Sequence, residues 1–243
     1  MTGMGIDVLG VVGDSFGTLF RNRTVAILAI IGALISAAFS FILTSQVTSL
    51  HGLMSGAPSL ATVLPSVFSL VGVFGIGVLV IYLVNIFIEG SLMTAASDAK
   101  KNLGAAAGQA IGRYLYFLVT SIIVSVAVSI GLVLLVIPGI YLAVKLSLAP
   151  VEVVVGKKGV VESLKSSWDA TNGNAWGVLF AGAAMLIAVV IISLIFTGIF
   201  ALVGVQSIGQ FIGTFFGYAF PVLLVLIYQQ IGMPAKKGTR KKR

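Results

Sequence analysis

Six long apolar runs divide this chain, and their length limits what it can fold into. They span residues 24–43, 66–88, 114–137, 140–155, 176–203 and 208–231. A helix of about 20 apolar residues crosses the roughly 30 Å hydrocarbon core of a bilayer with its backbone polar groups paired internally. The strands of a membrane barrel would instead alternate apolar and polar residues over about 10 positions. The sequence therefore predicts an all-α fold, a polytopic membrane bundle of six transmembrane helices.

Composition narrows the class of protein further. Charged residues make up 9% of the chain, against roughly 25% in soluble domains, which excludes a soluble protein. The chain has no cysteine and one histidine, so a disulfide framework, a thiol nucleophile and a multi-histidine metal site are excluded. None of the common nucleotide-binding, protease or hydrolase motifs occurs. We therefore expect a protein that is not an enzyme and that carries no cofactor and no metal.

The loops between the runs are of two kinds, and the kinds alternate. The connections 44–65, 138–139 and 204–207 contain no Lys, Arg, Asp or Glu, whereas the N-terminal segment, 89–113, 156–169 and the C-terminus carry nearly all of them. Lys and Arg are retained in the cytoplasm during membrane insertion. The pattern predicts a multi-pass protein of the cell membrane with both termini cytoplasmic.

The fourth run is short and contains Lys145 and Pro150. We interpret it as a full span. Without this span Lys157 and Lys158 would lie outside the cell, whereas the other charged connections are predicted to be cytoplasmic. A re-entrant or tilted segment is the alternative.

Two cytoplasmic segments have apolar residues at helical spacing opposite polar ones, at 6–19 and 161–171. This pattern predicts amphipathic helices in the cytoplasmic interface. An offset of 152 residues aligns Ser15 with Ser167 and Asn22 with Asn174, and 103–114 is a weaker middle copy. We expect one integral membrane domain over 1–243, built from three parallel units of an interfacial helix and a hairpin, at about 1–97, 98–155 and 156–243. The alternative is that the chain has no repeat, because any protein built from membrane hairpins shows such a pattern.

The segment around the fourth run resembles a known family. It reads Ile-Pro-Gly-Ile-Tyr-Leu-Ala-Val-Lys at 137–145, Leu-Ala-Pro at 148–150 and Glu-Ser-Leu-Lys-Ser-Ser-Trp at 162–168. These motifs resemble the membrane domain of some glycerophosphoryl diester phosphodiesterases and related stand-alone prokaryotic six-span proteins of uncharacterised function. The detailed likeness covers about residues 130–180. It implies a fold and a membrane location, but not the phosphodiesterase reaction, because the chain lacks a hydrolytic domain.

Polar residues within the runs are functional candidates, since a charge at the bilayer centre costs about 2.5–3.5 kcal/mol on insertion scales. Lys145, Glu89, Asn85 and Glu152 form our candidate intramembrane polar site. We expect Lys145 roughly 7–8 Å below the outer boundary, either as an inert residue at a helix break or as a contact for an anionic headgroup or solute. Glu89, on one helix face with Asn85, either ends a span, with Arg113 or Lys100 as a partner, or titrates within it.

Glycine at every fourth position, as in Gly209, Gly213 and Gly217, predicts close helix packing within the bundle or between two copies.

The tail 234–243 supplies six of the fifteen basic residues behind the formal charge of +8: Lys236, Lys237, Arg240, Lys241, Lys242 and Arg243. Near an anionic leaflet each basic residue contributes on the order of 1 kcal/mol. We expect this tail to face anionic lipid headgroups and no nucleic acid, because no aromatic residue interleaves with its charges.

Two hypotheses for the function stay open. The first is a non-enzymatic scaffold or accessory module held against anionic lipid. The alternative is a carrier or permease for a lipid or amphiphilic anion that uses Lys145 and Glu89. Membrane lipids are the expected partners in both cases, and a second copy of the chain or another membrane protein stays open as a further partner.

Single cysteines test the orientation, because the natural chain has none. A maleimide that does not cross membranes should label Ser207→Cys in intact cells, since this position lies in an uncharged connection. Ser97→Cys, in a charged connection, should be labelled only after permeabilisation. Labelling of Ser97→Cys in intact cells would contradict the predicted orientation.

Overall fold

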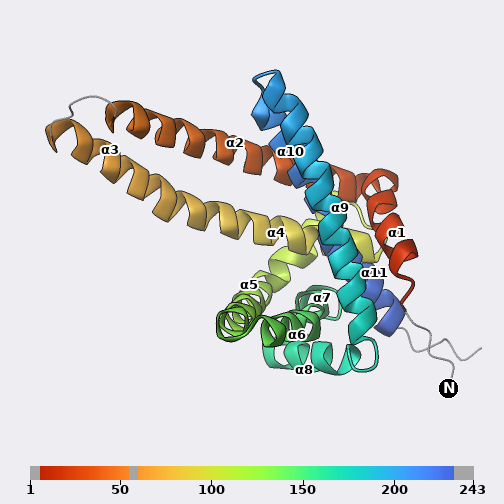
Figure 1. The fold of residues 1–243 in the computed structure, drawn as a ribbon. Helices are drawn as coiled ribbons and strands as arrows, with labels where there is room; N and C mark the ends of the chain where they lie inside the picture. The colour runs from red at the N-terminus through yellow and green to blue at the C-terminus, as the bar shows by residue number, and fades with distance from the viewer. Residues whose placement is uncertain (1–5, 55–59, 233–243) are drawn as a thin grey trace, which may run out of the picture.

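The computed structural model describes residues 6–54 and 60–232. Within these ranges every regular element is a helix (Figure 1). The elements are α1 (Val8–Arg21), α2 (Arg23–Met54), α3 (Leu60–Gly72), the π-helical turn η1 (Val73–Gly77), α4 (Val78–Ser97), α5 (Leu103–Leu134), α6 (Val136–Leu146), α7 (Ala149–Val154), α8 (Val160–Ala170), α9 (Ala175–Leu202), α10 (Gln206–Gly217) and α11 (Ala219–Gly232).

Six stretches of the described residues are long and apolar enough to cross a membrane. They are Arg23–Ser45, Val63–Ser97, Leu103–Leu134, Val136–Val154, Ala175–Leu202 and Gln206–Ile231. Each overlaps one of the six apolar runs, because continuous apolar sequence over this length forms helix when water is absent. The predicted all-α, six-span architecture is confirmed.

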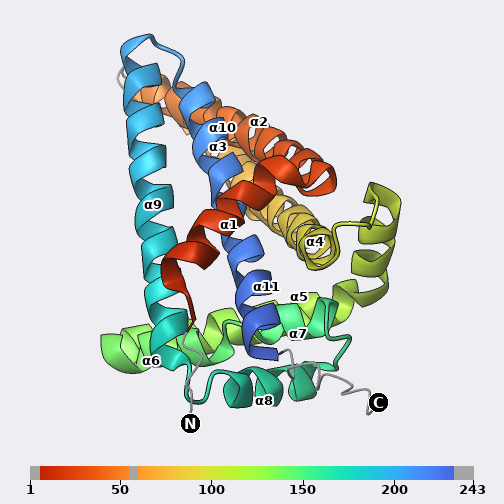
Figure 2. The same ribbon diagram turned by 90° about the vertical axis from the view of Figure 1, so that its right-hand side faces the viewer.

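The spans are arranged as three hairpins that diverge from a common base. The hairpins are α2 with α3–η1–α4, α5 with α6, and α9 with α10, and we call them the arms. In Figures 1 and 2 the arms point in three different directions. The base consists of α1, α7, α8, α11 and the adjoining ends of α4 and α5 (Figure 2).

The buried core lies in the base, around α7 and α11. Residues 151–154 of α7 are all buried, as are Val222, Leu223 and Ile227 of α11. The arms instead expose large apolar side chains, with Ile76 70% and Leu202 90% exposed. Such surfaces are unfavourable in water but are covered by acyl chains in a bilayer. The arms are therefore the lipid-facing part of the molecule.

The turn of the second arm lies at Leu135, and the prediction that Pro138 and Gly139 form this connection is wrong. Leu135 is extended, with φ −157° and ψ 132°, and it ends α5 and begins α6. Pro138 fits the first turn of α6, where a backbone N–H has no helical partner. Gly139 lies against α5, because a Cβ on it would come within 2.5 Å of the Leu132 nitrogen.

The middle interfacial segment is also different from the prediction. Residues 103–114 are not a separate helix but the first part of α5, which runs without interruption to Leu134. Asn102 caps this helix by accepting a hydrogen bond from the Ala105 N–H at 2.9 Å. No proline or second cap follows before the span, so the two parts join into one helix.

Helices α1 and α8 bury narrow faces that contain serine. Helix α1 buries Val11, Ser15 and Leu19, and α8 buries Ser163 and Ser167. Leu9 of α1 is 82% exposed, on the surface of the base. Small side chains let helix backbones approach closely, which explains why Ser15 and Ser167, aligned by the repeat, are both fully buried.

Candidate functional site

The break between α6 and α7 is the first notable polar feature of the base. Pro150 has no N–H, so the helical hydrogen-bond pattern cannot continue through this point. Helix α8 crosses the break and presents Ser167 to it. The Ser167 Oγ donates to the Lys145 carbonyl at 2.8 Å and accepts from the Leu148 N–H at 3.2 Å. One buried hydroxyl thus satisfies two backbone groups that the break leaves without helical partners.

Lys145 lies in the base against α8, farther from the turn of the second arm than predicted. Because the turn lies at Leu135, Lys145 is roughly 15 Å along the helix from that turn. Its side chain donates to Asn172 Oδ1 at 2.5 Å. The ammonium also lies 5.4 Å from the ring centroid of Trp168 and 5.7 Å from that of Tyr141, and the residue is 4% exposed.

These contacts make Lys145 a link between α6 and the end of α8. Cation–π contacts contribute roughly 0.5–2 kcal/mol, with the larger values where water is excluded. Tyr141 and Trp168 also contact each other edge to face, with ring centroids 5.7 Å apart. The two rings and the Asn172 amide enclose the ammonium, which leaves little of it accessible to a solute.

Glu152 of α7 forms a second buried link, with different partners. It pairs with Lys158 at 3.0 Å and accepts hydrogen bonds from Ser166 at 2.5 Å and Tyr228 at 3.2 Å. Glu152 is 2% exposed. Removal of one partner from such a buried pair is strongly destabilising. Glu152 therefore connects α7 to α8 and α11, and these contacts do not include Lys145.

A polar cavity of about 870 Å³ opens beside Glu152 and α8. Its lining mixes both signs of charge: Glu152, Lys158, Val161, Glu162, Lys165, Ser166, Asp169, Ala170 and Tyr228. In residues 6–54 and 60–232 no group of three His, Cys, Asp or Glu side chains is placed to hold a metal ion.

The charged connections lie together at the base. Arg113 donates to the carbonyls of Lys157 at 2.5 Å and Lys158 at 3.3 Å. Thr24 donates to the Lys101 carbonyl at 3.0 Å, and the Asn22 amide to the Ala95 carbonyl at 3.0 Å. Segments that the sequence groups by charge are thus joined by hydrogen bonds at one end of the molecule.

A polar network inside the membrane-spanning region connects the first, second and sixth spans. Asn85 of α4 accepts a hydrogen bond from the Tyr218 hydroxyl at 2.6 Å and one from Ser36 of α2 at 3.4 Å. Its amide nitrogen donates to the Ile81 carbonyl at 2.9 Å. Gly32 leaves room for this arrangement, because a Cβ there would overlap the Tyr218 hydroxyl.

Glu89 lies one turn beyond Asn85 on α4 and is half-buried. Among the described residues its carboxylate has no hydrogen-bond or ion-pair partner. Arg113, one of its two predicted partners, donates to the loop carbonyls instead. The structure therefore brings Asn85 and Glu89 near each other but joins neither to Lys145 or Glu152.

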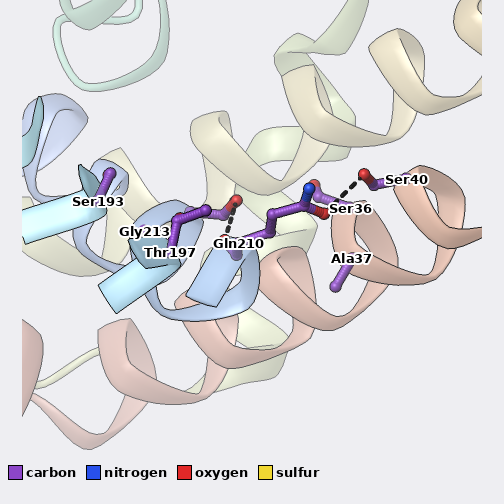
Figure 3. Close-up of a pocket in the computed structure, with 8 residues that line it drawn as sticks. Ser36, Ala37, Ser40, Ser193, Thr197, Gln210 and Gly213 are labelled. Atoms are coloured by element: carbon purple, nitrogen blue, oxygen red, sulfur yellow. Dashed lines mark hydrogen bonds between the residues drawn. The ribbon is translucent and has the colours of Figure 1, made fainter. Parts of the chain in front are cut away.

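A second cavity, of about 420 Å³, lies between α2, α9 and α10 (Figure 3). It is lined by Ser36, Ala37, Ser40, Ser193, Thr197, Gln210, Gly213 and Thr214. Ser40 donates to the Gln210 side-chain oxygen at 2.8 Å (Figure 3). Thr214 donates to the Gln210 backbone carbonyl at 2.9 Å. The lining contains hydroxyl and amide groups but no charge.

Two of the three predicted packing glycines lie against α9. A Cβ on Gly209 would come within 2.5 Å of Thr197 Cα, and one on Gly213 within 2.7 Å of Ser193 Oγ. Gly217 has open space instead. The basic tail residues at 236–243 lie outside the described part of the chain.

Sequence reasoning missed the partners that complete each cluster. Asn172 and Trp168 around Lys145, and Tyr218 beside Asn85, come from segments far away in the sequence. An available signal was the repeat, which aligned Ser167 with Ser15 without indicating what either serine contacts.

This architecture defines a multi-pass α-helical integral membrane protein. The chain is 30% identical over 115 residues to a UPF0259 membrane protein of Pectobacterium carotovorum subsp. carotovorum (strain PC1). The matched stretch covers 46% of this chain and 46% of that relative, so it spans about half of the relative's length. No family model and no solved structure matches the chain. The similarity is thus to a bacterial membrane protein and does not support a link to the glycerophosphoryl diester phosphodiesterases.

Substitution of Ser167 by alanine should weaken the base. Ser167→Ala leaves the Lys145 carbonyl and the Leu148 N–H unpaired, and we expect a loss of about 1–3 kcal/mol in the free energy of unfolding. Unfolding in mixed micelles with increasing dodecyl sulfate measures this loss.

Ser163→Ala is the matched control on the same buried face of α8. The Ser163 hydroxyl donates only to the Val160 carbonyl of its own helix, at 2.7 Å, so the change should be close to neutral. Equal stability of the two variants would contradict the role given to Ser167.

Proposed function

We propose that this protein is a non-enzymatic membrane scaffold or accessory module, with its base held against the anionic inner leaflet. The proposal rests on what the two most buried charged side chains, Lys145 and Glu152, contact. Lys145 is enclosed by partners from α6, α8 and the turn after α8. Glu152 borders the cavity of about 870 Å³ but is 2% exposed and is bound by Lys158, Ser166 and Tyr228. A carrier would instead need such charges facing a path for its solute.

The surface of the base supports contact with the interface. Leu9 and Phe20 of α1, Val161 of α8 and Trp176 at the start of α9 are exposed apolar side chains. Helices α1 and α8 belong to the base, and α9 follows α8 directly in the chain. Apolar side chains beside basic residues are typical of segments that lie in the headgroup region. The basic tail would add six charges on this side.

Neutralising the tail tests the proposed contact with anionic lipid. Replacement of all six tail Lys and Arg residues by Gln should remove most of the preference for phosphatidylglycerol over phosphatidylcholine, since each charge contributes about 1 kcal/mol. The fraction of spin-labelled lipid immobilised by the reconstituted protein measures this preference.

The control keeps the charge and changes the residue type. A tail with Arg at Lys236, Lys237, Lys241 and Lys242 should retain the preference, and high salt should weaken it. If the Gln tail retained the full preference, the tail would have no part in holding the base to lipid.

A carrier for a lipid or amphiphilic anion is the second candidate. It is favoured by one observation, the Glu89 carboxylate, which lies next to the Asn85 network and has no hydrogen-bond or ion-pair partner among the described residues. Lys145 supports this candidate less well, because its ammonium is enclosed by two rings and an amide.

Glu89→Gln separates the two candidates. If the protein is a scaffold, flip-flop of fluorescent phosphatidylglycerol in proteoliposomes should equal that of protein-free liposomes, with and without this change. The control is Glu162→Gln, which removes an exposed carboxylate of α8. Faster flip-flop with the natural chain that is lost in Glu89→Gln and kept in Glu162→Gln would favour the carrier.

A further inference from the structure

The uncharged cavity between α2, α9 and α10 has no part in the proposed scaffold. It lies away from the base, within the arms. Gln210 is the fifth residue of α10, so it lies roughly 6 Å along the helix from its start. At this depth a polar side chain faces acyl chains unless another polar group covers it.

Three groups at this cavity have hydrogen-bond donors that the described residues do not use. The hydroxyls of Ser40 and Thr214 donate to Gln210, and that of Ser36 donates to Asn85. The hydroxyls of Ser193 and Thr197 and the side-chain nitrogen of Gln210 donate to no described residue. Unpaired donors in an apolar medium are costly, so the cavity favours an occupant that offers acceptors.

The lining also indicates the charge of the occupant. No Lys, Arg, His, Asp or Glu lines the cavity. An anion or a cation would lose its hydration without gaining an opposite charge, so an uncharged group with oxygen acceptors fits best. The volume of about 420 Å³ lies within the roughly 300–1,000 Å³ of small-molecule sites.

The backbone of the hairpin keeps this space available. A side chain on Gly213 would collide with the Ser193 hydroxyl, and one on Gly209 with the backbone of Thr197. Glycine at both positions lets α9 and α10 approach while the hydroxyls face the cavity. Figure 3 shows Gln210 reaching across from α10 to Ser40 of α2, at one wall of the cavity.

We propose that this cavity binds the uncharged, carbonyl-bearing part of a membrane-soluble molecule. Ser193, Thr197 and Gln210 donate hydrogen bonds to its carbonyl oxygens. An acylglycerol ester and a quinone share this chemistry. The inference goes beyond the scaffold function, which requires no ligand in the arms, and either one can fail without the other.

Binding to the full chain in nanodiscs of ether-linked phosphatidylcholine tests this proposal, because this lipid contributes no ester carbonyl. The probes are dioleoylglycerol and decylubiquinone, with the dialkyl ether of glycerol as the analogue without carbonyls. Native mass spectrometry measures the bound fraction. We expect at least one carbonyl-bearing probe to bind at least about ten-fold more tightly than the ether analogue, since at least two of the three neutral hydrogen bonds are gained.

The double variant Ser193→Ala/Thr197→Val removes both hydroxyls with little change in volume. It should weaken binding of that probe about ten-fold. Ser125→Ala/Ser129→Ala, which removes two exposed hydroxyls from α5, should bind like the natural chain. The comparison of ester with ether on the natural chain remains decisive if the first variant fails to fold.

The two carbonyl-bearing probes distinguish the sources of the carbonyl. Tighter binding of dioleoylglycerol assigns an acylglycerol, and tighter binding of decylubiquinone assigns a quinone. Equal binding of the ether analogue, unchanged binding to Ser193→Ala/Thr197→Val, or no binding of either probe would overturn the proposal. Retention of a second polypeptide in place of both probes would also overturn it.

Discussion

The contact between α8 and the α6–α7 break holds the base together. Pro150 interrupts the fourth span, and the Ser167 hydroxyl satisfies two of the backbone groups at the interruption. Lys145 and Glu152, on either side of the break, then bind α8 and its flanking segments through Asn172, Ser166 and Lys158. Buried polar groups are tolerated only when paired, so these contacts decide where α8 lies and thereby how the third arm, which follows it in the chain, leaves the base.

The base and the arms are stabilised by different means. In the base, α7 and α11 bury apolar side chains as in a soluble core, and hydrogen bonds join the charged connections. The arms have few buried residues, and lipid takes the place of a protein neighbour. Within them, polar contacts such as Asn85 with Tyr218 and Ser40 with Gln210 connect spans that belong to different hairpins. The cavity between α2, α9 and α10 offers unpaired hydrogen-bond donors to a polar group within the membrane.

Individual residues show how far sequence reasoning reached. The helix break was expected from Pro150, and Asn85, Glu89, Lys145 and Glu152 were singled out as polar residues within apolar runs. The distance of Lys145 from the turn was underestimated because the turn was placed at Pro138, a residue that also suits the first turn of a helix. The partners of Lys145 and Asn85 were missed because Asn172 and Tyr218 are distant in the chain, and no local pattern marks such contacts.

The sequence by itself determined that the chain is helical, that it crosses a membrane six times and which connections are charged. These properties depend on the length of apolar runs and on the cost of unpaired backbone groups in lipid, which are local quantities. Only the tertiary structure decided that the hairpins diverge, that α8 closes the α6–α7 break and that hydroxyls of three helices line one cavity. These features depend on which helix faces meet, and the meeting faces are set by packing between residues far apart in the chain.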